Sequence, residues 1–84
     1  MDRRELLRRL ATRAHNIPFQ DFLELIGAFG FELVRVRGSH YMFHRAGVPK
    51  LVNIQERKGQ AKAYQVRQFL RLVEMYNLHL EDPG

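Results

Sequence analysis

The stretch that decides the fold is Arg37–Phe43, which reads RGSHYMF. Gly-Ser between two alternating runs is a signal for a two-residue hairpin turn, because glycine supplies the positive φ that such turns need. A turn at Gly38 and Ser39 fixes the register of the two strands beside it. We predict four directly opposed pairs, namely Arg37 with His40, Val36 with Tyr41, Arg35 with Met42, and Val34 with Phe43.

This register separates apolar from basic side chains, because successive side chains of a strand point to opposite faces. One face would carry four apolar residues: Val34, Val36, Tyr41 and Phe43. The other face would carry Arg35, Arg37, His40, Met42 and His44. We therefore expect the hairpin to bury its apolar face and to leave a histidine and two arginines on the open face.

Two helices are expected before the hairpin. Leucine and alanine at helical spacing, flanked by arginines, predict an amphipathic helix over residues 2–14. Pro18 predicts the start of a second helix that runs to about residue 29. Gly30 would end it in the left-handed conformation, with Phe31 folding back in a Schellman motif. Gly27 lies inside this helix, where we expect it to allow close packing against a neighbour.

After the second helix we expect three strands and a last helix. The strands are predicted over residues 31–37, 40–45 and 50–55, and a polar loop over 56–60 leads to a helix over about 61–77. The predicted fold class is therefore α+β: a three-stranded antiparallel sheet with helices packed on one face, plus the extra N-terminal helix. The other face of the sheet would stay open and basic.

Length and composition restrict the function. Eighty-four residues make one small domain, and no apolar run approaches the roughly 18 residues that span a bilayer. The chain has no cysteine, so we expect neither disulfides nor thiolate metal sites, and we interpret it as a cytoplasmic protein without a membrane segment. The net charge is +5, and 11 of the 14 basic residues are arginine. Arginine suits phosphate recognition, so a polyanion or an acidic protein is the expected partner.

Two kinds of catalytic site are poorly supported. His40 and His44 on one strand have Cα atoms about 13 Å apart, from four steps of roughly 3.3 Å, so they cannot share one metal ion. A Ser-His-Asp triad is equally unfavoured, because Ser39 and His40 are sequence neighbours that point to opposite faces. We therefore expect no metal and no cofactor.

RNA cleavage needs less machinery, because the substrate supplies its own nucleophile, the 2′-hydroxyl. One histidine can act as general base or acid, since its reference pKa of about 6.5 lies near working pH. His40 is the candidate, and Arg37 across the hairpin could stabilise charge on the phosphoryl oxygens. The competing interpretation is that His40 is an ordinary surface residue beside a hairpin turn.

The sequence resembles the HicA family of toxins from bacterial type II toxin–antitoxin modules. The residues that carry the likeness are Gly30-Phe31, Arg35, Gly38-Ser39-His40 and Phe43, together with the downstream segment Lys58–Leu70. The resemblance covers about residues 17–78, so residues 1–84 would form one HicA-like domain in which residues 1–15 are an N-terminal extension. Residues 53–55 and 63–65 read NIQ and AYQ, where many members have Pro-x-His and Gly-Thr-Leu, so roles tied to those motifs do not transfer.

The resemblance implies a fold similar to a double-stranded-RNA-binding domain. It implies a metal-independent ribonuclease that cleaves mRNA and arrests growth, with a HicB-like antitoxin as protein partner. The family's essential histidine maps onto His40. From the basic residues we add a predicted set that would hold RNA phosphates: Arg35, Arg37, Lys58, Lys62 and Arg67.

Two other functions remain open on the same scaffold. One is a non-catalytic RNA-binding module that uses the basic face for electrostatic attraction alone. The other is a protein-interaction domain whose basic face matches an acidic partner.

Overall fold

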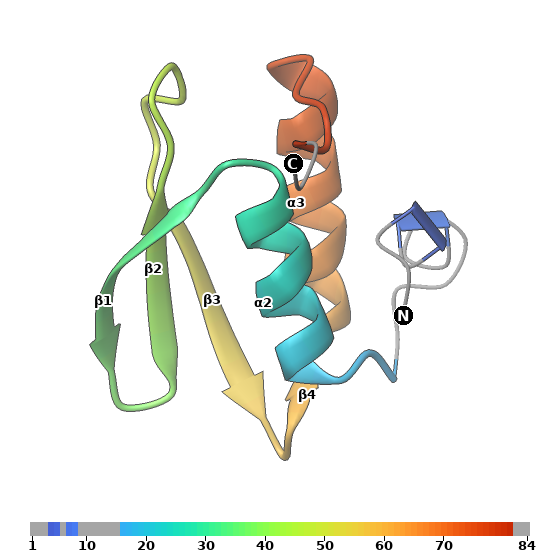
Figure 1. The fold of residues 1–84 in the computed structure, drawn as a ribbon. Coiled ribbons are helices and arrows are strands. Elements are labelled where there is room, and N and C mark those ends of the chain that lie inside the picture. The colour runs from blue at the N-terminus through green and yellow to red at the C-terminus, as the bar shows by residue number, and fades with distance from the viewer. Residues whose placement is uncertain (1–3, 6, 9–15, 82–84) are drawn as a thin grey trace.

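A computed structural model of the chain describes residues 4–5, 7–8 and 16–81 (Figure 1). Its elements, in order, are α2 (Phe19–Ala28), β1 (Glu32–Arg37), β2 (His40–His44), β3 (Val52–Arg57), β4 (Gln60–Ala61) and α3 (Ala63–Met75). The helix expected over residues 2–14 lies largely outside the described residues. Residues 4–5 and 7–8 are helical, and Leu7 packs against the core.

The strands form one antiparallel sheet in the order β1-β2-β3-β4, and α2 and α3 lie together on one face of it (Figure 1). The expected α+β class is confirmed. The expected number of three strands is wrong, because the polar segment predicted as a loop over 56–60 is itself a hairpin. None of the helices in the described ranges is long and apolar enough to cross a bilayer.

The β3–β4 hairpin turns at Lys58 and Gly59, whose φ angles are 52° and 76°. Two consecutive positive φ angles are typical of a type I′ turn, which matches the twist of the flanking strands. The turn escaped prediction because lysine rarely adopts positive φ and because β4 has only two residues. The segment before α2 covers the outer edge of β4: the Ala61 N–H donates to the Ile17 carbonyl at 2.9 Å, and the Phe19 N–H to the Gly59 carbonyl at 2.9 Å.

The β1–β2 hairpin has the predicted turn, with Gly38 at a φ of 60°. Three of the four predicted pairs are confirmed: Arg37 with His40, Val36 with Tyr41, and Arg35 with Met42. The fourth is wrong, because Leu33 rather than Val34 lies opposite Phe43. The register shifts between Leu33 and Arg35, so Val34 is the extra residue of a β-bulge, a feature common at sheet edges.

The predicted burial of Val34 and Val36 on β1 is wrong, because they keep 56% and 49% of their surface exposed. Leu33 on the same strand is also open, at 50% exposed. The reason is the placement of the helices, which lie over the other strands and leave β1 as an outer edge (Figure 1). The expected burial of Val52 and Ile54 on β3 is confirmed, at 8% and 1% exposed.

The end of α2 follows the predicted Schellman motif. Gly30 has a φ of 88°, and its N–H donates to the Gly27 carbonyl at 2.9 Å. The Phe31 N–H donates to the Ile26 carbonyl at 3.4 Å. The packing expected at Gly27 is wrong: beyond the adjoining backbone of its own helix, a Cβ there would have no described atom within 4 Å, since this side of the helix faces solvent.

The core centres on Phe69 of α3, which is 2% exposed. Its ring meets those of Phe22, Phe29 and Phe31 at centroid distances of 5.8, 5.7 and 5.5 Å, each in an edge-to-face arrangement. Aromatic pairs at these distances stabilise a fold by about 0.5–1.5 kcal/mol each beyond their buried area. Phe69 therefore fixes α3 to α2 and to the turn that leads into β1.

The two glycines near the end of α2 should respond in opposite directions to the same substitution. Gly27→Ala should raise the free energy of unfolding by about 0.5–1 kcal/mol, because alanine restricts the unfolded chain and favours the helix. Gly30→Ala should lower it by more than about 1 kcal/mol, because the φ is positive and the new Cβ would lie 2.5 Å from Glu81 Oε1. Urea unfolding of both variants measures the two effects. Equal effects would contradict this account of the helix end.

Candidate functional site

His40 is the first residue of β2 and its side chain is exposed. It lies directly opposite Arg37 of β1 on one side and Gln55 of β3 on the other. Directly opposed residues of neighbouring strands point to the same face, so these three side chains share the face of the sheet that the helices leave open. The imidazole is therefore accessible to a large ligand from that face.

Gln55 connects this face to the start of α3. Its side-chain Nε2 donates to Ser39 Oγ at 3.2 Å, and its Oε1 accepts a hydrogen bond from Lys62 Nζ at 2.6 Å. Both polar ends of the amide are thus held, which fixes the orientation of the Gln55 side chain next to His40. The ammonium group of Lys62 is brought to the same neighbourhood, since Lys62 is the residue that precedes the first turn of α3.

The backbone beneath this network is also secured. The Gln55 N–H donates to Gln65 Oε1 at 2.8 Å, so a side chain of α3 satisfies a donor on the outer edge of β3. The Glu56 N–H donates to the Ser39 carbonyl at 3.0 Å, which continues the β2–β3 pairing beyond His40. The β1–β2 turn and the end of β3 are therefore held in a fixed relation.

An exposed aromatic ring lies next to the Lys62 ammonium. Lys62 Nζ is 5.9 Å from the centroid of the Tyr64 ring, which is 48% exposed. Gln65 Nε2 donates to the Tyr64 hydroxyl at 3.4 Å, which helps to orient the ring. A cation over an aromatic face at this distance is a weakly favourable contact.

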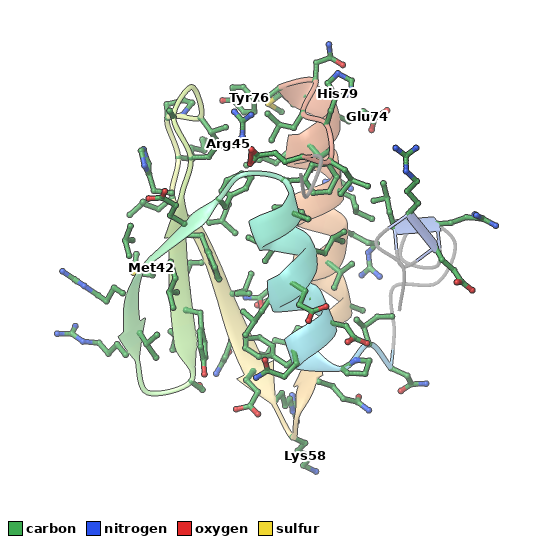
Figure 2. All side chains as sticks on the ribbon, viewed as in Figure 1. Met42, Arg45, Lys58, Glu74, Tyr76 and His79 are labelled. Carbon is green, nitrogen blue, oxygen red and sulfur yellow. The ribbon has the colours of Figure 1, made fainter. Side chains whose placement is uncertain are left out.

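The predicted phosphate-binding residues fall into two groups. Arg35 and Arg37 are exposed on β1, on the His40 face, and Lys62 reaches that neighbourhood through Gln55. Lys58 lies exposed at the tip of the β3–β4 hairpin (Figure 2), and Arg67 is exposed on α3. In the described part of the chain, no hydrogen bond joins either Lys58 or Arg67 to the network around Gln55.

Sequence reasoning assigned no role in the site to four residues that organise it: Ser39, Gln55, Tyr64 and Gln65. Strand alternation predicts Gln55 on the open face, because Val52 and Ile54 point to the core. That signal did not reveal its partners, since the contact with Lys62 depends on how α3 packs against β3. Across residues 4–5, 7–8 and 16–81, no three His, Asp or Glu side chains gather closely enough to hold a metal ion.

The arrangement offers an accessible imidazole beside two positively charged side chains, of which Lys62 is held in place by a hydrogen bond. Arg37 approaches from one neighbouring strand, and Lys62 is hydrogen-bonded to the residue opposite His40 on the other. An imidazole can accept or donate a proton near neutral pH, and positive groups around it favour an anionic substrate or a transition state that gains negative charge.

Comparison with protein-family models, curated proteins and solved structures finds no match to this chain.

The hydrogen bond from Gln55 to Gln65 should contribute measurably to stability. Gln65→Ala should lower the free energy of unfolding by about 1 kcal/mol, because it leaves a part-buried N–H without its protein acceptor. Gln68→Ala is the matched control, because Gln68 lies about one helical turn after Gln65, is exposed, and has no side-chain hydrogen bond within the described residues. We expect this variant to change the free energy of unfolding by no more than about 0.5 kcal/mol. Denaturant unfolding and the exchange rate of the Gln55 amide report the difference. Two equal values would show that this bond adds nothing.

Proposed function

We propose that the protein is a metal-independent endoribonuclease of the HicA type, the toxin of a type II toxin–antitoxin module, with His40 as its general acid or base. The observation that carries this proposal is the position of His40, exposed on the open sheet face between Arg37 and the Gln55–Lys62 pair. The histidine of the HicA-like motif, His40, is thus the histidine of the described sheet that lies opposite the hydrogen-bonded Gln55 side chain.

The reaction uses the 2′-hydroxyl of RNA as nucleophile. His40 in its neutral form accepts the hydroxyl proton as the oxygen attacks the adjacent phosphorus, and the bond to the 5′-oxygen breaks. The departing oxygen takes a proton from water or from a second acid, and a cyclic phosphate remains on the upstream fragment. Negative charge grows on the phosphoryl oxygens during the attack, and Arg37 and Lys62 lie where they can stabilise it.

RNA is the favoured substrate because the groups around His40 match a phosphate chain. Arg35 and Arg37 add two guanidinium groups on the same face, and exposed arginines bind phosphate oxygens in a two-point manner. Lys58 and Arg67 would extend the contact toward the hairpin tip and the surface of α3. Tyr64 offers a ring on which an unpaired base can stack.

The fold and the partner complete the proposal. A helix, three long strands and a second helix on one face support the likeness to a double-stranded-RNA-binding domain. The exposed apolar residues of β1, Leu33, Val34 and Val36, support a protein partner such as a HicB-like antitoxin, because a partner would remove them from water. We place this activity in the cytoplasm, where mRNA and antitoxin would both be available.

His40→Ala should abolish cleavage without abolishing folding. We expect the rate of RNA cleavage to fall by about 10²–10⁴, since this is the range that general acid–base catalysis contributes, and growth arrest on induced expression to disappear. His44→Ala is the matched control, because His44 is an exposed histidine at the other end of the same strand. It should cleave within about threefold of the unmodified protein. Equal cleavage by the His40→Ala variant would exclude His40 as the catalyst.

Arg37→Gln should weaken RNA binding in a salt-dependent way. Removing one phosphate contact should reduce the slope of log K against log salt by about 1, when binding is measured in the His40→Ala background. Salt-sensitive binding without any cleavage by the unmodified protein would instead favour the non-catalytic RNA-binding module. An absence of RNA binding would favour the protein-interaction domain.

A further inference from the structure

A groove runs between the outer edge of β3 and α3, away from His40. It consists of two adjoining hollows of about 120 and 160 Å³, which share Lys50, Gln68 and Leu72 in their walls. The floor of the first hollow includes Ile54 and Phe69 of the core. Two apolar side chains beside the groove are unusually open, with Leu51 at 50% and Met75 at 72% exposed. The groove is thus an apolar surface with no cover from the described residues.

The backbone of β3 presents free hydrogen-bonding groups to this groove. The Gln55 N–H points away from β2, toward Gln65 Oε1. Backbone groups alternate in direction along an antiparallel strand, so the N–H and C=O of Asn53 point the same way. β4 pairs only with Glu56 and Arg57, so within the described residues no strand lies beside Asn53. An unpaired strand edge of this kind is a template for an added strand.

The charge of the groove is positive. Lys50 lines both hollows and Arg71 lines the second, while none of the described aspartates and glutamates lines either of them. The remaining polar lining comes from three uncharged residues, Asn53, Gln65 and Gln68. A ligand that satisfies these groups carries carboxylates beside Lys50 and Arg71 and apolar side chains over the floor.

We propose that this groove binds an extended acidic segment of a partner protein, which adds as a strand to the free edge of β3. Its backbone pairs with the N–H and C=O of Asn53, its apolar side chains cover Leu51 and Leu72, and its carboxylates meet Lys50 and Arg71. This mode of recognition takes affinity from backbone hydrogen bonds and specificity from alternate side chains. The groove shares Gln65 with the network around Gln55, but neither His40, Arg37 nor Lys62 lines it among the described residues. The segment therefore binds whether or not the protein cleaves RNA.

A protein strand fits this groove better than RNA does. Only a peptide offers the paired N–H and C=O groups that an open strand edge requires. The apolar floor and the exposed Leu51 and Met75 also favour side-chain burial over phosphate contact. RNA would use Lys50 and Arg71 alone and would leave the edge of β3 unpaired.

The test uses the purified full chain and a labelled, capped peptide of about ten residues that alternates valine and glutamate. We expect saturable binding below millimolar concentration by fluorescence anisotropy, and slower hydrogen exchange at the Asn53 amide in the complex. The double variant Lys50→Glu, Arg71→Glu should weaken binding about tenfold or more. Asn53→Pro should do the same, because it removes the outward N–H while sparing the β2–β3 ladder.

A matched control should leave peptide binding within about twofold. Arg57→Glu reverses a charge that lies outside the groove. The proposal is overturned if no binding saturates, if all variants bind alike, or if a valine–lysine peptide binds as tightly. It is also overturned if single-stranded RNA displaces the peptide while hydrogen exchange at the Asn53 amide is not slowed in either complex, because the groove would then bind by charge alone. RNA cleavage by the same protein is a separate readout, so the proposed ribonuclease function can fail without affecting this result.

Discussion

The contacts of the Phe69 ring hold together the parts of the structure that the site depends on. Phe69 lies on α3, and its three edge-to-face partners lie on α2, at the end of α2 and just before β1. These contacts set the position of α3 over the sheet. They therefore also set where the first turn of α3 meets β3, which is the place where Lys62 and Gln65 reach Gln55.

A second constraint is the strict division between the two faces of the sheet. Alternation along β2 and β3 sends Phe43, Val52 and Ile54 into the core, and it sends His40 and Gln55 to the opposite face. Because the helices satisfy the apolar face, the open face can carry charges and an imidazole at no cost to the core. The proposed chemistry and the stability of the domain thus use different residues of the same strands.

The edges of the sheet differ in how they are protected from pairing with another strand. Ile17 and Phe19 cover β4 by hydrogen bonds to its backbone. β1 is the opposite edge, and there a bulge at Val34 and the charges of Arg35 and Arg37 discourage uncontrolled pairing. The stretch of β3 around Asn53 has no bulge and no neighbouring strand among the described residues, and the charges beside it, Lys50 and Arg71, favour an acidic strand. That difference is why an added strand is proposed for β3 and not for β1.

Much of the local structure could be predicted because its causes are local. Glycine at a turn and a Schellman ending at Gly30 act within a few residues, and both are confirmed. The alternation beside the turn is confirmed for three of its four predicted pairs. The errors arose where the cause was distant or unusual. The bulge at Val34 and the positive φ of Lys58 have no clear sequence signal. The exposure of β1 depends on which strands the two helices cover, and that is decided by tertiary packing.

The sequence by itself determined the α+β class, the hairpin turn, three pairs of its register and the candidate His40. It determined these because turn chemistry and side-chain periodicity are properties of neighbouring residues. Only the tertiary structure decided that Gln55 is held between Ser39 and Lys62, and that a groove opens between β3 and α3. Those features come from the packing of Phe69 against α2, which brings residues distant in the chain into contact and which no local pattern encodes.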